Sequence, residues 1–148
     1  MAKTVAIGIQ DFEKLRENDC FYVDKTGFIK EWWENNDEVT LITRPRRFGK
    51  TLNMSMLECF FSNKYEGRGD LFEGLSIWEE EKYRQLQGTY PVIFLSFANI
   101  KFSEYETTRK AMNGIITRVF DDFRSIMKSE IFTAEDRERY GRVRDDMT

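Results

Sequence analysis

One stretch of the chain, residues 38–61, constrains the fold more than any other. It begins with a β-branched run at 38–43, which is typical of a buried strand: Glu38-Val39-Thr40-Leu41-Ile42-Thr43. A loop follows at 44–49, and apolar residues from Leu52 onward then recur with a helical period up to Phe61. A strand, a short loop and a helix in this order predict an α/β architecture.

The loop ends in Gly49-Lys50-Thr51, a sequence suited to binding phosphate groups. Gly49 lets the backbone approach phosphate oxygens, and Lys50 can place its ammonium on the β- and γ-phosphates. Thr51, at the start of the helix, can offer its hydroxyl to Mg²⁺. The free N–H groups of the helix N-terminus add partial positive charge. The motif therefore predicts a site for the phosphates of a nucleotide, together with Mg²⁺.

The rest of the loop is strongly basic. Arg44, Arg46, Arg47 and Lys50 fall within seven positions, and no acidic residue occurs between Glu38 and Glu58. A solvated basic loop is the plain alternative, but cations beside the positive end of a helix repel unless an anion is present. We therefore add the central residues of the loop to the predicted nucleotide contacts: Arg46, Arg47 and Phe48.

A second strand is predicted at 91–97, where the residues are almost continuously apolar. Such a run is typical of a strand that is buried on both faces, as in a parallel sheet under helices. A long amphipathic helix is predicted at 104–130. The sequence thus predicts an α/β fold with parallel strands near 39–43 and 91–97, flanked by helices.

Helix caps predict further elements. Asp11 is placed to cap a short helix over 11–16, and Asp24 a helix that continues to about Asn35. Thr133, with Asp136 in the box position, predicts the start of a last helix. Residues 64–89 are charged and interrupted by glycines, which favours loops with one short helix near 78–86.

Composition excludes several classes of site. The chain of 148 residues contains no histidine, which rules out Ser-His-Asp and Cys-His nucleophiles and histidine-ligated metals. Its two cysteines, Cys20 and Cys59, lie among apolar neighbours and are predicted to be buried free thiols. The short apolar stretch at 5–9 cannot form a secretory or membrane segment, so we expect a cytoplasmic protein with no membrane partner.

Three motifs in order give the chain a resemblance to the predicted AAA-ATPase-like family of bacterial and archaeal proteins. They are Gly8-Ile9-Gln10-Asp11-Phe12-Glu13-Lys14-Leu15-Arg16, then Tyr22-Val23-Asp24-Lys25-Thr26, then the loop Arg44-Pro45-Arg46-Arg47-Phe48-Gly49-Lys50-Thr51. The segment 90–97 is similar to the family's second sheet strand, so the resemblance covers nearly the whole chain. Arg44 stands where the usual phosphate-binding pattern has its first glycine, and the resemblance implies that this is a family trait.

The resemblance implies a three-layer, AAA-like P-loop NTPase fold with ATP and Mg²⁺ as ligands. The family's acidic strand follows the point where this chain stops, and many members continue to a PD-(D/E)XK nuclease-like domain. We therefore expect a single, incomplete domain over 1–148, with a lead-in at 1–37, the strand, loop and helix at 38–62, and the second strand and long helix at 90–130. The last helix is expected to pack against a C-terminal domain or a second subunit.

Some assignments remain open at this stage. Residues that precede the loop strand often flank the base in related ATPases, which makes Asp11 and Phe12 candidates for the adenine side, although a helix cap and a core phenylalanine explain them better. No catalytic residue is assigned, because 91–97 ends without a carboxylate and the acidic pair in 115–122 belongs to the amphipathic helix. The alternatives to an ATP-binding domain are an arginine-rich module that binds nucleic acid and a regulatory domain that binds nucleotide without hydrolysis.

Overall fold

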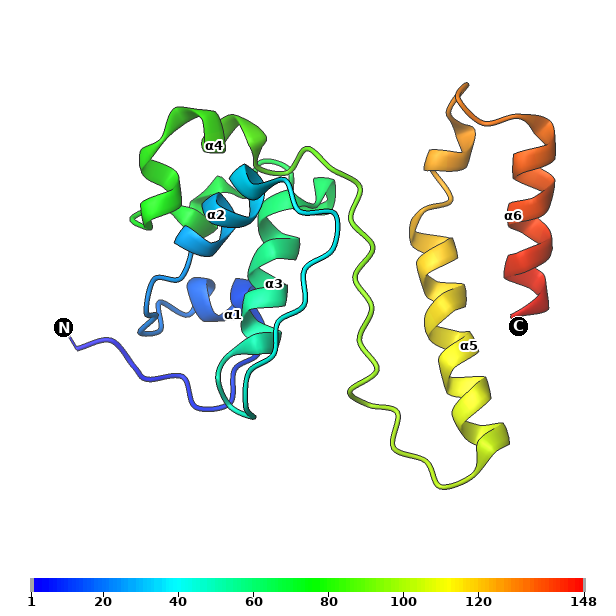
Figure 1. The fold of residues 1–148 in the computed structure, drawn as a ribbon, viewed down its shortest axis with the longest axis horizontal. Helices are drawn as coiled ribbons and strands as arrows, with labels where there is room; N and C mark the ends of the chain where they lie inside the picture. Colours follow the sequence, from blue (N-terminus) through cyan, green and yellow to red (C-terminus); the bar gives the residue numbers. More distant parts are fainter. Residues whose placement is uncertain (1, 148) are drawn as a thin grey trace. The chain divides into compact units, whose positions relative to one another are not determined.

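The computed structural model describes residues 2–147 and divides the chain into two compact units, Met1–Val92 and Ile93–Thr148. Helices α1 to α4 belong to the first unit, and α5 and α6 to the second (Figure 1). Most residue contacts of each unit lie within that unit.

The predicted parallel sheet is absent from the described residues, and the α/β P-loop fold class is therefore wrong for this structure. Helices account for 53% of the residues and strand for 3%, with no sheet over 2–147. The strand content consists of isolated bridges, which pair Val5 with Phe21 and Ser62 with Tyr90.

Both predicted strands are instead extended segments without a ladder. Residues 39–43 and 91–97 have no regular secondary structure, and they leave apolar side chains in solvent, with Val39 88%, Leu41 83% and Ile93 61% exposed. A β-branched run forms a strand only where a neighbouring strand pairs with its N–H and C=O groups. No segment within residues 2–147 supplies that neighbour.

The N-terminal helices form at the predicted places. Helix α1 spans Phe12–Glu17, and the Asp11 carboxylate caps it by accepting a bond from the N–H of Lys14 at 3.2 Å. Helix α2 spans Gly27–Asn35, and its N-cap is Thr26.

The prediction that Asp24 caps α2 is wrong. Its carboxylate accepts bonds from the N–H of Thr26 at 2.8 Å and from the N–H of Ser76 at 2.7 Å. The second of these bonds joins residues 52 positions apart. The side chain that resembled a local helix cap therefore makes a tertiary tie.

Helix α3 spans Lys50–Phe61, as the helical period predicts. It packs against α1. Its inner face reaches the core through four buried side chains, Met56, Cys59, Phe60 and Phe61. The N–H of Phe12 donates to Ser55 Oγ at 3.0 Å, which ties the start of α1 to the middle of α3. The positions of α1 and α3 are thus fixed relative to each other.

The glycine-rich segment 63–87 forms part of the core, which its sequence did not predict. It contains three short 3₁₀ helices, η1 (Asn63–Tyr65), η2 (Gly69–Phe72) and η3 (Ser76–Glu79), and then α4 (Glu81–Leu86). Phe72 is fully buried and stacks on Phe12, with ring centroids 5.2 Å apart. The rest of the main core cluster includes Ile29 of α2, Leu71 of η2, Leu75, Ile77 of η3 and Tyr83 of α4.

The second unit is a helical hairpin that follows the extended segment from 93 to 104. Helix α5 spans Tyr105–Asp122, which is shorter than predicted, and η4 (Ile126–Lys128) follows it. Helix α6 spans Ala134–Asp146 and starts with the predicted capping box between Thr133 and Asp136. The two helices run side by side (Figure 1), with the rings of Phe120 and Tyr140 4.8 Å apart.

The hairpin has no closed core of its own. None of the residues that the structure describes between 93 and 147 is buried, and Ile131 is 85% exposed. No helix among residues 2–147 is long and apolar enough to cross a membrane.

Candidate functional site

The N-terminus of α3 is the part of the first unit that is best suited to bind an anion. Gly49 precedes the helix with a φ of 74° and a ψ of 21°, so a left-handed residue is followed directly by the right-handed helix. This alternation turns successive backbone N–H groups toward one side, in the arrangement that binds anions in many proteins. A left-handed residue at this position favours glycine, which has no Cβ to clash.

The first N–H groups of α3 are free to bind a ligand. No side chain caps the helix, and within the described chain no residue accepts a hydrogen bond from the N–H of Lys50, Thr51 or Leu52. Asn53 is the first residue whose N–H is used, by the carbonyl of Gly49 at 2.9 Å. Uncapped N–H groups and the helix dipole together attract negative charge.

Lys50 is folded back over the loop. Its Nζ donates a hydrogen bond to the carbonyl oxygen of Arg44 at 2.6 Å. This bond holds the ammonium against the loop that leads into the free N–H groups of α3. An anion bound there would offer this ammonium charged acceptors in place of a neutral carbonyl.

The basic side chains of the loop are exposed and lack counterions. Arg44, Arg46 and Arg47 are all exposed, and none forms an ion pair with any residue from 2 to 147. Arg47 also adopts a φ of 69°, a left-handed conformation that is unfavourable for a residue with a Cβ. Local strain of this kind often occurs at functional sites.

Two further predicted contacts, Thr51 and Phe48, lie at or next to the free N–H groups in the sequence. Thr51 is the second residue of α3 and is exposed, so its hydroxyl is available to a metal ion or to a phosphate. Phe48 is 59% exposed, which leaves its ring open to solvent beside the arginines.

The two adenine-side candidates lie elsewhere along α3. Phe12 is fully buried and its ring packs against Phe72, so it presents no open face to a base. Asp11 caps α1 near the middle of α3. Burial raises the pKa of Glu58 there, and Asp11 adds to the increase while Lys64 opposes it. The roles of helix cap and core residue are confirmed for this pair, and the adenine role remains a prediction.

Lys25 is a residue that the sequence did not assign to the site. Its Nζ lies 3.6 Å from the position that a Cβ on Gly49 would occupy. In the sequence, Lys25 is marked by the motif Tyr22-Val23-Asp24-Lys25-Thr26, and the start of a helix explains this motif without a role in binding. The closeness of Lys25 to the loop is a tertiary contact between residues 24 positions apart, so no local pattern could predict it.

The acidic pair in 115–122 is helical, as expected, because these residues lie in α5. Asp121 accepts bonds from Arg144 at 2.7 Å and from Arg124 at 3.0 Å, and the bond from Arg144 is the main reason that its pKa is lowered. Among residues 2–147, no group of three or more His, Cys, Asp or Glu side chains is placed to bind a metal ion.

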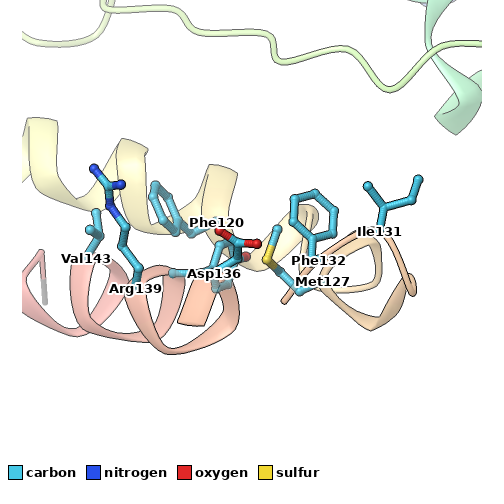
Figure 2. A pocket seen from close by; sticks show the side chains of 8 residues that line it. Phe120, Met127, Ile131, Phe132, Asp136, Arg139 and Val143 are labelled. Carbon is cyan, nitrogen blue, oxygen red and sulfur yellow. The ribbon is translucent and has the colours of Figure 1, made fainter. Parts of the chain in front are cut away.

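A pocket of about 410 Å³ opens in the helical hairpin (Figure 2). Its one carboxylate, that of Asp136, is already bonded to Thr133 in the cap of α6. The lining is mainly apolar and consists of Phe120, Met127, Ile131, Phe132, Asp136, Arg139, Tyr140 and Val143. The loop before α3 therefore remains the candidate site.

Comparison with known proteins agrees with the motifs. The sequence model of the AAA-ATPase-like family, described as predicted AAA-ATPase, matches residues 6–146. A protein of Azotobacter chroococcum mcd 1, described as an uncharacterised protein in the vnfD 5′ region, is 40% identical over 96 residues. The match covers 64% of this chain and 17% of that protein, so the chain spans less than a fifth of this relative's length. No solved structure matches.

Proposed function

The chain belongs to the AAA-ATPase-like family, and on that premise we propose that the loop before α3 binds the phosphates of ATP together with Mg²⁺. The observation that supports this most is the uncapped start of α3, where free N–H groups follow the left-handed Gly49. The N–H groups at a helix start bond to side chains, to water or to a ligand. In the described chain, helices α2, α4 and α5 also start without a side-chain cap, so the left-handed Gly49 and the unpaired cations are what distinguish α3. A helix start left without such a cap, and surrounded by unpaired cations, is suited to a multiply charged anion.

The proposed phosphate contacts divide into backbone and side-chain groups. The N–H groups of Lys50, Thr51 and Leu52 donate to phosphate oxygens, and the Lys50 ammonium moves from the Arg44 carbonyl to the β- and γ-phosphates. The guanidinium groups of Arg46 and Arg47 can donate in pairs to the remaining oxygens. Charge-assisted hydrogen bonds of this kind are about twice as strong as neutral ones.

Thr51 is the residue that would ligate Mg²⁺. Its hydroxyl is exposed at the first turn of α3, beside the expected phosphates. Mg²⁺ prefers oxygen ligands, and it is usually bound by few protein groups together with phosphates and water. The hydroxyl would then be the protein's contribution to a coordination shell that phosphate oxygens and water complete. When bound, the ion would neutralise charge on the phosphates.

Binding is the activity that we propose for the described residues. Hydrolysis, which the family's name implies, would also need a carboxylate that orients Mg²⁺ and the attacking water. Hydrolysis by the whole protein is a separate proposal, which an ATPase assay on the longer chain would test.

A second candidate function rests on the exposure of Phe48. An aromatic ring that is 59% exposed and directly follows two arginines resembles the stacking and backbone contacts of proteins that bind single strands. Binding of single-stranded DNA without nucleotide, with steep weakening as salt rises, would support this alternative. Negligible DNA binding at low salt would exclude it.

Thermal unfolding with and without Mg-ATP tests the proposed function. A ligand that binds only the folded state raises stability by about 2.7 kcal/mol at a concentration of one hundred times Kd. We expect Mg-ATP to raise the melting temperature of the native chain and to raise that of Lys50→Ala much less. Lys14→Ala, an exposed lysine of α1, is the matched control and should respond like the native chain. Equal shifts in all three, or no shift in any, would refute ATP binding at this loop.

A further inference from the structure

Lys25 lies at the same end of α3 as Lys50 but comes from a separate part of the chain. Its Nζ is 3.6 Å from the place of a Cβ on Gly49, the residue that precedes the free N–H groups. The ammonium therefore lies close to the left-handed residue that precedes the free N–H groups. A side chain from outside the loop thus brings a further positive charge to it.

The backbone on both sides of Lys25 is fixed by hydrogen bonds. Asp24 is bonded to the N–H of Ser76 at 2.7 Å, and the fully buried Thr26 accepts a bond at its Oγ1 from the N–H of Ile77 at 3.2 Å. The N–H of Lys25 itself donates to the hydroxyl of Tyr22 at 3.4 Å. These ties hold the residue in place before any ligand binds, which lowers the entropy cost of a contact.

The ammonium of Lys25 has no protein partner in the part of the chain that the structure describes. It forms no ion pair and donates no hydrogen bond among residues 2–147, and Asp24, its neighbour, is bonded to Thr26 and Ser76. A second unpaired ammonium at the positive end of a helix is unfavourable on its own. It becomes favourable when an anion occupies that end.

We propose that Lys25 contacts the bound polyphosphate directly, as a second lysine beside Lys50. This inference rests on the proposed function, because it concerns the same ligand. It assigns a phosphate contact to the segment 22–26, which would then bind the same ligand as the loop before α3. Because the contact is to phosphate and not to the base, it strengthens binding of inorganic tripolyphosphate as well as of ATP.

Titration calorimetry with Mg-ATP and with inorganic tripolyphosphate plus Mg²⁺ tests the role of Lys25. We expect Lys25→Met to weaken binding of both ligands about tenfold, as the loss of one charge-assisted hydrogen bond predicts. Lys25→Arg keeps the charge and should recover most of the affinity. Lys14→Met is the control for loss of a lysine and should bind like the native chain. The melting temperature without ligand should not fall in Lys25→Met, because its ammonium has no partner among the described residues and is unfavourable at the positive end of the helix.

The outcomes separate the two proposals. If the native chain binds both ligands and Lys25→Met binds them equally well, the inference about Lys25 is overturned and the ATP-binding proposal stands. If Lys25→Met loses affinity for ATP but not for tripolyphosphate, the residue acts on the nucleoside and the phosphate contact is refuted. If the native chain binds neither ligand, the proposed function itself fails.

Discussion

The ammonium of Lys50 donates a hydrogen bond to the carbonyl oxygen of Arg44 at 2.6 Å. This bond closes the loop across the residues Pro45 to Gly49 and keeps the lysine beside the uncapped N–H groups of α3. A neutral carbonyl is a weaker partner for an ammonium than a phosphate oxygen. If the proposed ligand binds, the ammonium of Lys50 would exchange this carbonyl for phosphate oxygens.

Replacing Thr51 distinguishes a contact of its hydroxyl with Mg²⁺ from a contact with the phosphates. Thr51→Ala should weaken binding of ATP about tenfold when Mg²⁺ is present, because the hydroxyl ligand is lost. It should bind ATP like the native chain in excess EDTA, since the N–H groups and Lys50 remain. Titration calorimetry with and without Mg²⁺ measures both values. An equal loss under the two conditions would show that Thr51 acts on the phosphates and not on the metal.

Arg47 is expected to oppose stability and favour binding. Its left-handed φ of 69° costs about 1–2 kcal/mol for a residue with a Cβ, while glycine costs about 0.5–1 kcal/mol through the entropy of the unfolded chain. Arg47→Gly should therefore raise the free energy of unfolding by about 0.5–1 kcal/mol. The same change removes a guanidinium and should weaken ATP binding.

Urea denaturation and calorimetry check the two effects of Arg47→Gly. Arg46→Gly is the matched control, because Arg46 is not among the left-handed residues of the described chain. It should weaken binding without any gain in stability. A loss of stability in Arg47→Gly would contradict the idea that the loop is strained there.

Phe72 is the central packing residue of the 3₁₀ segment. It is fully buried, it stacks on Phe12, and it packs against the edge of Phe60 with ring centroids 5.2 Å apart. Phe72→Ala should lower the free energy of unfolding by about 3–5 kcal/mol. Phe21→Ala, at a ring that is 55% exposed in the same unit, should cost less than about 1 kcal/mol. Urea denaturation of both variants would reject this account of the core if the costs were similar.

Asp24 makes stability depend on pH in the acidic range. Burial acts to raise its pKa, but the hydrogen bonds from Thr26 and Ser76 outweigh burial, and the net pKa lies below the ordinary value of 3.8. The carboxylate therefore stabilises the fold at pH values above the pKa of the unfolded chain. This contribution is lost as the pH falls below about 3.8 and through the lower folded pKa.

The variant Asp24→Asn tests this dependence. It should be less stable than the native chain at neutral pH, and the difference between the two should shrink as the pH falls below the ordinary carboxyl pKa of 3.8. Denaturation midpoints measured from neutral to acid pH give the comparison. A difference that stays constant over this range would mean that the charge of Asp24 is not involved.

Local signals predicted helices α1, α3 and α6 correctly, but not the cap of α2 or the end of α5. The Asp11 cap, the period of α3 and the capping box of Thr133 and Asp136 each depend on residues within a few positions of one another. Such interactions are decided by the nearby sequence, so a sequence is enough to find them. The loop motif before α3 is local in the same sense, and its residues do lie together.

The sheet and the core could not be predicted in this way. The runs at 39–43 and 91–97 have strand propensity, but a strand also needs a partner, and propensity says nothing about where a partner lies. In 63–87, Leu71, Phe72 and Leu75 are brought inward by short 3₁₀ turns, which follow neither a strand period nor a helix period. The contact of Lys25 with the loop likewise depends on tertiary structure.

The most direct test follows the backbone N–H groups of α3 in a two-dimensional N–H correlation spectrum as Mg-ATP is added. The account predicts that the largest shifts occur at Lys50, Thr51 and Leu52, whose N–H groups have no acceptor among the described residues. It also predicts that Lys50→Ala needs much more Mg-ATP to reach the same shifts. Shifts concentrated in another part of the chain, or no shifts at saturating Mg-ATP, would contradict the claim that this loop binds the nucleotide.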